Sequence, residues 1–367
     1  MSMLLIALLA LVKVVFLVFA FVMPVASLLT WMERRQSAMM QDRIGPNRAN
    51  IGKYRAWGLL HIAADGLKMF FKEDFIPAKA HKVLFTIAPV MALVPALVIF
   101  AIVPFGDFLC LNSAQLFEKL PTAAQCTGRT TPMQIAVLDM GMLFYFAIAS
   151  LSVYGAMLAG WSSYNKWGLL GALRASSQMI AYEVTMGMAI LGIFLVYGTL
   201  EPGALARAQG TNLLHWGIVT QPLAFVLYLV ASIAETKRTP FDAVEGEPEI
   251  IGYFVEYSGM RFGMFYLGEF IEVVLSSAII VTVFLGGWYL PGWDYAQSLP
   301  HLLSIGVALG VWGAKVLLLC WFQLLIRWTL PRFKPDQIIR LGWLRLLPAS
   351  ILNVVATAVG VVLLGSR

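Results

Sequence analysis

The chain has 367 residues, of which 60% are hydrophobic and only 13% are charged. Soluble domains carry about 25% charged residues, so this composition excludes an ordinary soluble protein. The formal net charge of +6 could indicate a nucleic-acid partner. A membrane protein, however, concentrates Lys and Arg in its cytoplasmic loops, and the distribution of these residues decides between the two explanations.

Apolar segments of roughly 20 residues, the length that crosses a bilayer, recur along the whole chain. They predict one all-α membrane domain over residues 1–367, a polytopic bundle of about eight transmembrane helices. We interpret the first segment as a retained helix, because it contains Lys13 and has no basic region before it. The expected spans are residues 3–30, 83–105, 133–160, 173–197, 217–234, 263–290, 302–326 and 344–364.

Residues 53–73, between the first two spans, are too polar to cross a membrane. Apolar side chains recur there at helical spacing, and a second stripe contains His61, Asp65, Lys68 and Lys72. This pattern predicts an amphipathic helix at the cytoplasmic membrane interface. The helix is either a plain surface anchor or, because its polar stripe includes an acid and a histidine, one wall of a cavity.

Several ionisable side chains fall inside the expected spans, where each needs a partner or a water-filled cavity. Glu269 and Glu272 lie three residues apart on one helix face, and two close carboxylates can together hold and release a proton. A single buried acid could equally make a structural hydrogen bond between helices, but the whole set predicts a buried path for protons or ions. Besides Lys13, the set is Asp139, Glu183, Glu269, Glu272 and Lys315.

The segment 235–261 is acidic although it lies between two spans on the basic side of the chain. It is either a solvated loop or, because aromatic and aliphatic residues are interleaved with the acids, a folded loop at the mouth of a cavity. Its acids are Glu235, Asp242, Glu245, Glu247, Glu249 and Glu256, and its basic residues are Lys237, Arg238 and Arg261.

Lys and Arg are distributed unevenly between the two sides that the spans define. Twenty of the 26 lie on one side and four on the other, and two lie within spans. Basic loops stay in the cytoplasm, so both chain termini are predicted to be periplasmic. The net charge then reflects topology, and no nucleic-acid partner is expected. The basic segments are residues 31–82, 161–174, 235–261 and 327–345.

The three cysteines and four histidines have no CxxC or HxxxH spacing. They therefore give no sign of an iron–sulfur, haem or zinc site, and we expect any redox cofactor to lie in another chain. Cys110 and Cys126 share one external loop, where they could form a disulfide or remain two thiols.

Five segments resemble the family of quinone-chamber membrane subunits of respiratory complex I, the H-type subunits of the bacterial enzyme. The match covers nearly the whole chain in the same order. The segments are ERRQSAMMQDRIGPN (33–47), GLLHIAADGLKMFFKED (58–74), LAGWSSYNKWGLLGALRASSQMIAYE (158–183), AETKRTPFDAVEGEPEIIGYFVEYSGMRF (234–262) and RWTLPRFKPDQIIRLGWLRLLP (327–348).

The resemblance implies a membrane subunit of a proton-pumping NADH:quinone oxidoreductase, a translocase, in a bacterial inner membrane. Quinone would be the substrate, and this chain would hold no covalently bound cofactor. FMN and iron–sulfur clusters would lie in partner subunits. The implied partners are other membrane-arm subunits, the peripheral-arm subunits that carry the terminal iron–sulfur cluster, and membrane lipid.

The same resemblance implies roles for individual residues, none of them catalytic. The quinone chamber would include Glu33, Arg34, Arg43, Asp65, Arg238 and Asp242. Proton coupling would involve Asp139, Glu183, Glu235, Glu245, Glu247, Glu249, Glu269 and Glu272. Two alternatives are the membrane subunit of an energy-converting hydrogenase, against which the EGEPE run argues, and a proton-coupled secondary transporter.

Overall fold

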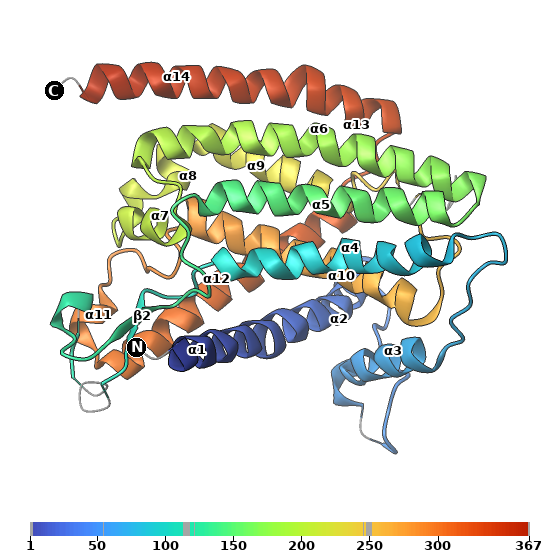
Figure 1. Ribbon diagram of the computed structural model, residues 1–367, viewed down its shortest axis with the longest axis horizontal. Helices are drawn as coiled ribbons and strands as arrows, with labels where there is room; N and C mark the ends of the chain where they lie inside the picture. Colours follow the sequence, from blue (N-terminus) through green and yellow to red (C-terminus); the bar gives the residue numbers. More distant parts are fainter. Residues whose placement is uncertain are drawn as a thin grey trace.

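Long helices lying side by side dominate the fold (Figure 1). The computed structural model describes residues 3–53, 55–112, 118–120, 122–244, 246 and 252–365. In these ranges seven helices are long and apolar enough to cross a membrane, which confirms the predicted all-α polytopic bundle. They are α1 (Met3–Val15) with η1 (Phe16–Val22) and α2 (Met23–Met40), α4 (Lys82–Ile99) with η3 (Phe100–Ile102), α5 (Gly141–Ser162), α6 (Lys166–Tyr197), α10 (Gly259–Phe284), α12 (His301–Thr329), and α13 (Pro335–Leu341) with η7 (Gly342–Leu346) and α14 (Leu347–Gly365).

The expected span 217–234 is broken in the structure. It consists of the one-turn helix α8 (Gly217–Thr220) and of α9 (Pro222–Glu235), which are separated at Gln221. At 1.5 Å per residue α9 is about 21 Å long, shorter than a hydrocarbon core of about 30 Å. Two polar side chains of α14 hydrogen-bond to Gln221 at this break. The Gln221 amide donates to Thr357 at 2.9 Å and accepts from Asn353 at 3.0 Å.

The expected span 133–160 begins too early, because α5 starts at Gly141. The apolar residues before it pack back against the end of α4, where the Ala136 N–H donates to the Ala101 carbonyl at 2.8 Å. Asp139 consequently lies exposed in the turn before α5. The prediction that Asp139 is buried inside a span is therefore wrong, since an apolar run can be buried by loop packing as well as by a helix.

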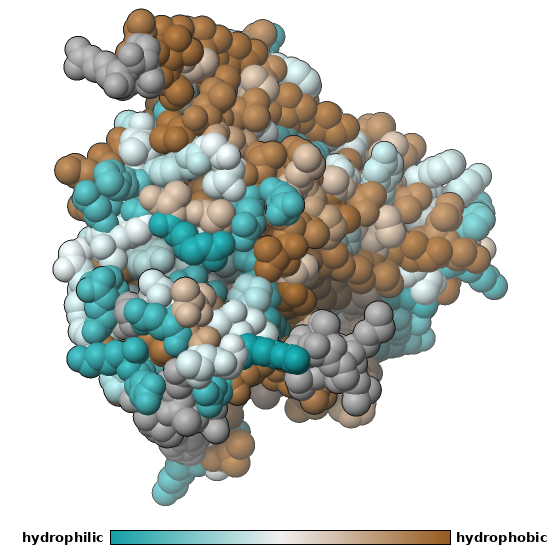
Figure 2. Space-filling model, turned by 60° about the vertical axis from the view of Figure 1, so that its left-hand side comes forward, coloured by the Kyte–Doolittle hydropathy of each residue, from teal (hydrophilic) through white to brown (hydrophobic). Residues whose placement is uncertain are grey.

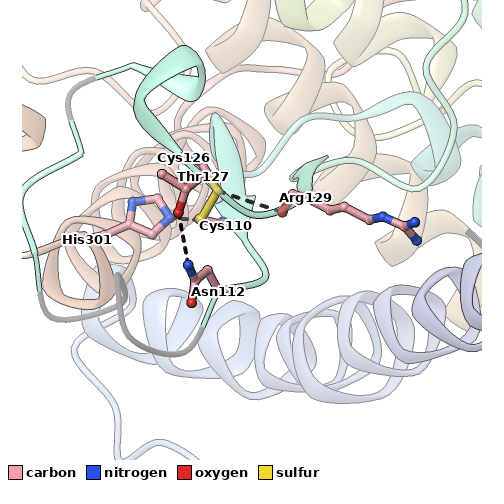
Figure 3. Close-up of a disulfide and its surroundings, with 6 residues drawn as sticks. All are labelled: Cys110, Asn112, Cys126, Thr127, Arg129 and His301. Atoms are coloured by element: carbon pink, nitrogen blue, oxygen red, sulfur yellow. Dashed lines mark hydrogen bonds between the residues drawn. A yellow bond between two sulfur atoms is a disulfide. The ribbon is translucent and has the colours of Figure 1, made fainter.

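The end of the bundle that holds both termini is closed by short elements (Figure 1). Strand β1 (Phe108–Cys110) pairs antiparallel with β2 (Thr130–Pro132), and Phe108 lies opposite Pro132. Cys110 and Cys126 form a disulfide, one of the two alternatives that the sequence left open. Figure 3 shows His301 beside it, where His301 Nε2 accepts the Cys110 N–H at 3.1 Å. The other elements here are η5 (Ala123–Gln125), α7 (Pro202–Gln209), η6 (Leu213–His215) and α11 (Tyr295–Ser298).

The amphipathic segment 53–73 contains the helix α3 (Leu60–Phe71), which follows η2 (Ala56–Gly58). Helix α3 lies at the end of the molecule opposite the termini and contacts α10 (Figure 1). None of the residues of α3, all of which the structure describes, is buried. Such a helix needs a further surface to cover its apolar face, and its place at the cytoplasmic interface stays a prediction.

Apolar side chains cover much of the outer surface of the helices. Phe19, Leu352 and Val362 are between 67% and 70% exposed. Figure 2 shows a broad apolar surface in brown, while the polar surface, in teal, lies mainly on the left of this view, with smaller patches at its right edge. Soluble monomers rarely expose contiguous apolar patches larger than a few hundred Å². Together with the seven long apolar helices, this surface makes the chain an integral membrane protein.

Lys315 of α12 fixes the end of the central helix α10. Its Nζ donates to the carbonyls of Leu285 at 2.6 Å, Gly287 at 3.0 Å and Tyr289 at 2.7 Å, and it lies 4.3 Å from the centre of the Trp216 ring. An ammonium group has three N–H donors, and all three are used here. A cation at a helix C-terminus is favourable, so these contacts give Lys315 a structural role at the end of α10.

We expect Lys315→Met to lower the apparent unfolding temperature of the detergent-solubilised protein by several degrees. The substitution leaves buried carbonyls without a donor, at a cost of about 1–3 kcal/mol for such a group. Lys72→Met, which changes an exposed lysine, is the control and should leave the transition in place. Equal transitions for both variants would contradict the structural role.

Candidate functional site

A buried cluster of alternating charges joins α2, α10, α12 and the segment that follows α9. Arg238 Nη1 donates to Glu33 Oε2 at 3.0 Å, and its Nη2 lies 3.6 Å from Glu269 Oε2. The Arg238 guanidinium also lies 4.1 Å from the centre of the Phe270 ring. The second carboxylate oxygen of Glu33 pairs with Arg327 Nη1 at 2.9 Å. Arg238 therefore holds two acids from two helices and is itself only 8% exposed.

Glu269 and Glu272 lie on one face of α10, as predicted, but each has its own cation. Glu269 pairs with Arg238, and Glu272 Oε2 lies 3.9 Å from Lys237 Nζ. Lys237 has a positive φ of 55° and also lies 5.5 Å from the centre of the Tyr253 ring. Each carboxylate thus has a basic residue beside it, and the two acids still lie close enough to repel each other, as predicted.

Gln178 of α6 shapes the chain that carries these basic residues. Its Nε2 donates to the carbonyls of Ala234 at 2.7 Å and of Phe241 at 2.8 Å. The backbone between them, residues 235–240, is therefore a fixed arc. Phe241 and Val244 beyond the arc are buried. The part of the acidic segment that the structure describes is therefore a folded loop and not a solvated one.

Asp242 lies at the end of this arc and is 8% exposed. Its Oδ2 accepts from Thr239 Oγ1 at 3.0 Å and from Arg332 Nη2 at 2.7 Å, and its buried Oδ1 has no hydrogen-bond partner among the described residues. Glu245, Glu247 and Glu249, the acids of the EGEPE run, lie outside the described residues. Their assignment to proton coupling stays a prediction.

Aromatic packing anchors the second half of the acidic segment. The Tyr257 ring stacks on Phe85 of α4 with ring centres 3.9 Å apart, and its hydroxyl lies 3.4 Å from Ser162 Oγ. Burial raises the pKa of Tyr257 to about 12, and this hydrogen bond partly opposes the rise. Arg261, at the start of α10, pairs with Asp74 at 3.2 Å. These contacts attach the segment to the chain that leaves α3.

A second polar group lies where α2 meets α3. Arg34 Nη2 pairs with Asp65 Oδ2 at 2.5 Å, and Lys68 lies 3.4 Å from the other oxygen of Asp65. Arg43, just beyond α2, is exposed and donates to Gln41 Oε1 at 2.7 Å and to Ser37 Oγ. Its described contacts are therefore with neutral groups, whereas Arg34 and Asp65 form a direct ion pair.

Asp65 lines a cavity of about 280 Å³ that lies between α2, α3, α4 and α10. The wall is mainly apolar, with a few polar groups that include Thr30 and Tyr266. Small-molecule sites are typically apolar clefts with few polar groups, and this cavity has that character. Its apolar lining includes Met23, Ile62, Met69, Leu93, Met264 and Leu267.

A smaller cavity, of about 30 Å³, lies between α4, α5, α6, α9 and α10. Glu235, Glu272 and Tyr145 line it together with three serines and a threonine. Glu235 Oε2 is buried and has no hydrogen-bond partner in the described part of the chain. A polar cavity needs about 10–15 Å³ to hold a water molecule. This space is therefore large enough for water to bridge the two acids.

Glu183 of α6 belongs to the same group of acids. It is half-buried and lies within electrostatic range of Glu235, which is in turn within range of Glu272. The structure therefore brings Glu183 and Glu272, two of the acids predicted inside spans, close to Glu235, which was predicted in the acidic segment and is the last residue of α9. Asp139, exposed in the turn before α5, is not among them.

Sequence reasoning missed four contributors to these clusters. Arg327 and Arg332 were counted only as cytoplasmic charges, although both lie in a segment of the family resemblance and each pairs with a predicted site acid. Gln178 lies at helical spacing from Arg174 and Tyr182 and in a segment of the resemblance, but its role in shaping the arc was not predicted, and Tyr145 gave no signal apart from being a polar group inside a predicted span. Among the described residues, no three His, Cys, Asp or Glu side chains lie close enough together to hold a metal ion.

Comparison with known proteins gives a consistent result. A family model described as NADH dehydrogenase matches residues 12–358. An NADH-quinone oxidoreductase H subunit of Cytophaga hutchinsonii is 39% identical over 349 residues, which are 94% of this chain and 95% of that protein. One of the H subunits of Geobacter metallireducens is 40% identical over 356 residues, 95% of both chains. The H subunit of Thermomicrobium roseum is 39% identical over 336 residues, 89% of this chain and 88% of the relative.

Proposed function

The chain belongs to the NADH dehydrogenase family, and on that premise we propose that it is the quinone-chamber subunit of a membrane-bound, proton-pumping NADH:quinone oxidoreductase. The cavity beside α3 carries the proposal, because it combines an apolar wall with an ion pair at its edge. The apolar wall suits the isoprenoid tail of a quinone. The ion pair of Arg34 and Asp65 suits the polar headgroup as it passes.

Oxidation of NADH and electron transfer would be carried out by FMN and iron–sulfur clusters in partner subunits, which supply electrons to the quinone. In this chain, Arg34 and Asp65 would line the entry, with Arg43 near it. Arg238, Glu33 and Asp242 would form the polar part of the chamber beyond it. The list of chamber residues is thus Glu33, Arg34, Arg43, Asp65, Arg238 and Asp242.

Quinone reduction to quinol consumes two protons and places negative charge near the chamber until they arrive. In a medium of low dielectric constant that charge acts strongly on nearby ions. It would attract Arg238, weaken its hold on Glu33 and Glu269, and so favour proton uptake by the acids of the small cavity. The coupling residues would be Glu183, Glu235, Glu269 and Glu272, with Glu245, Glu247 and Glu249 in the undescribed part of the loop.

The proposed orientation places α3 and the acidic segment in the cytoplasm and both termini in the periplasm of a bacterial inner membrane. The 20 basic residues on the α3 side support it. Both termini lie at the end of the bundle opposite α3 (Figure 1), as an even number of crossings requires. Helix α9 with α8 would supply the eighth crossing. Other membrane-arm subunits, peripheral-arm subunits and lipid would cover the exposed surfaces.

Purification of the tagged chain from its native membrane tests this function. We expect it to co-purify with flavin- and iron–sulfur-containing subunits, and we expect the assembly to reduce quinone with NADH and to acidify the lumen of inverted vesicles. The isolated chain in liposomes should transport nothing. A chain that purifies without partners and moves protons or a solute alone would instead be a secondary transporter.

A further inference from the structure

We propose that the hydroxyl group of Tyr145 connects Glu235 to Glu183 in the proton path, and that Tyr228 is the positioning residue that holds this hydroxyl in place. The proposal rests on the proposed function and assigns two residues to it that neither the sequence pattern nor the family resemblance singled out. Both tyrosines lie deep in the bundle, Tyr145 on α5 and Tyr228 on α9.

Tyr145 shares a cavity with one of the two acids and lies near the helix that carries the other. Tyr145 lines the small cavity together with Glu235 and is 4% exposed. Tyr228 is fully buried, and its hydroxyl donates to the Tyr145 oxygen at 3.2 Å. Met186 of α6 also lines this cavity, and Glu183, three residues earlier, lies on the same side of that helix. Tyr145 is therefore the member of the pair that lines the cavity between Glu235 and the helix that carries Glu183.

Packing alone does not account for the pair. A buried hydroxyl costs free energy unless it is hydrogen-bonded, and phenylalanine would fill the same space without that cost. The bond between the two tyrosines uses the Tyr228 proton, so the Tyr145 proton is directed elsewhere. Across the same cavity lies Glu235 Oε2, a buried acceptor that has no partner among the described residues. Water in the cavity can join the carboxyl group of Glu235 to the Tyr145 oxygen, and the Tyr145 proton is then available to the other acid, Glu183.

The proposed step moves one proton and no electrons. Protonated Glu235 gives its proton, through water in the cavity, to the Tyr145 oxygen, while the original Tyr145 proton passes to ionised Glu183. Glu235 ends ionised, Glu183 ends protonated, and Tyr145 is again a neutral phenol. Tyr228 keeps its proton throughout, and its hydrogen bond fixes the Tyr145 oxygen between the acids.

Glu183 is a suitable end point for this step. It lies on α6 beside Ile180 and Val184, which are 49% and 42% exposed. A proton that reaches Glu183 therefore arrives next to the outer, apolar face of the bundle. In the proposed assembly a neighbouring membrane subunit would receive it there.

The test compares Tyr145→Phe, Glu183→Gln and the double variant in the intact complex in inverted vesicles. NADH oxidation with an artificial electron acceptor reports assembly and should stay unchanged. We expect each single variant to lower quinone-dependent proton pumping by about tenfold or more, as for loss of a proton-transferring group. The double variant should be no worse than the worse single variant, because residues that act as a unit do not lose activity additively. Tyr295→Phe removes another buried hydroxyl, one that donates to the Trp288 carbonyl at 2.9 Å, and should pump normally.

Two results would overturn the inference: normal pumping by Tyr145→Phe, or losses in the double variant that multiply as they do for independent structural damage. If the Tyr145→Phe complex does not assemble, the variant Tyr228→Phe tests the inference instead. It keeps the phenol of Tyr145 but should slow proton pumping and increase the solvent isotope effect on pumping. An unchanged pumping rate and isotope effect would refute the role of the hydrogen bond between the two tyrosines. Failure of the proposed function can be told apart from failure of this inference, because in the first case the wild-type complex would show no quinone-dependent pumping at all.

Discussion

Replacement of Arg238 by Met is expected to abolish quinone reduction and to destabilise the chain by about 3–5 kcal/mol, the cost of removing one partner from a buried ion pair. Arg238 is the common partner of Glu33 and Glu269. Without it, two largely buried acids from α2 and α10 lose a cation. The apparent unfolding temperature in detergent and the NADH:quinone reductase rate of the complex measure the two effects.

Matched variants show whether the unpaired charge causes the loss. Arg327→Met removes the other partner of Glu33. The Arg327 side chain is 26% exposed, whereas that of Arg238 is 9% exposed, so Arg327→Met should destabilise the chain less than Arg238→Met. The double variant Arg238→Met with Glu33→Gln removes both the cation and one of the acids. It should recover part of the stability but not the reductase activity. Equal stability of Arg238→Met and wild type would refute the central place of Arg238.

The sequence was sufficient to predict features that depend on local pattern. The apolar runs that became α10 and α12 are long enough to identify a spanning helix without further information. The amphipathic spacing around Asp65 likewise identified α3. The charge count also predicts which side of the membrane each loop faces, and that orientation stays a prediction. These predictions rest on properties of continuous segments, and continuous segments are what a sequence displays directly.

The one error, on Asp139, and the contacts that the sequence did not reveal all concern interactions between distant segments. Asp139 follows an apolar run that packs against the end of α4 instead of extending α5. Lys315 is a charged residue inside a span, but the carbonyls that bind it belong to a turn about 30 residues earlier in the chain. The pair of Arg238 with Glu33 joins residues 205 positions apart. Which cation meets which acid depends on how the helices pack, and hydropathy contains no such information.

A side chain that fills the cavity beside α3 is expected to weaken the binding of long-tailed quinones. We expect Gly66→Leu to raise the KM for long-tailed quinones by about tenfold or more, since overpacking costs about 1–3 kcal/mol and each 1.4 kcal/mol is a factor of ten. Gly66 lines the cavity, and a Cβ built on it meets no atom within 4 Å, so the new side chain has room to enter the cavity. Leu also favours a helix by about 1 kcal/mol over Gly, and α3 should remain folded.

Three comparisons separate obstruction of the tail from general damage. Gly306→Leu adds the same side chain at a site on α12 where a Cβ also meets nothing within 4 Å, and it should leave the KM unchanged. A short-tailed quinone should be affected less by Gly66→Leu than a long-tailed one. Gly263→Leu, on the opposite wall of the cavity, places its Cβ 3.0 Å from the sulfur of Met69 and should reproduce the effect. A normal KM for long-tailed quinone in both cavity variants would show that the tail does not pass between α3 and α10.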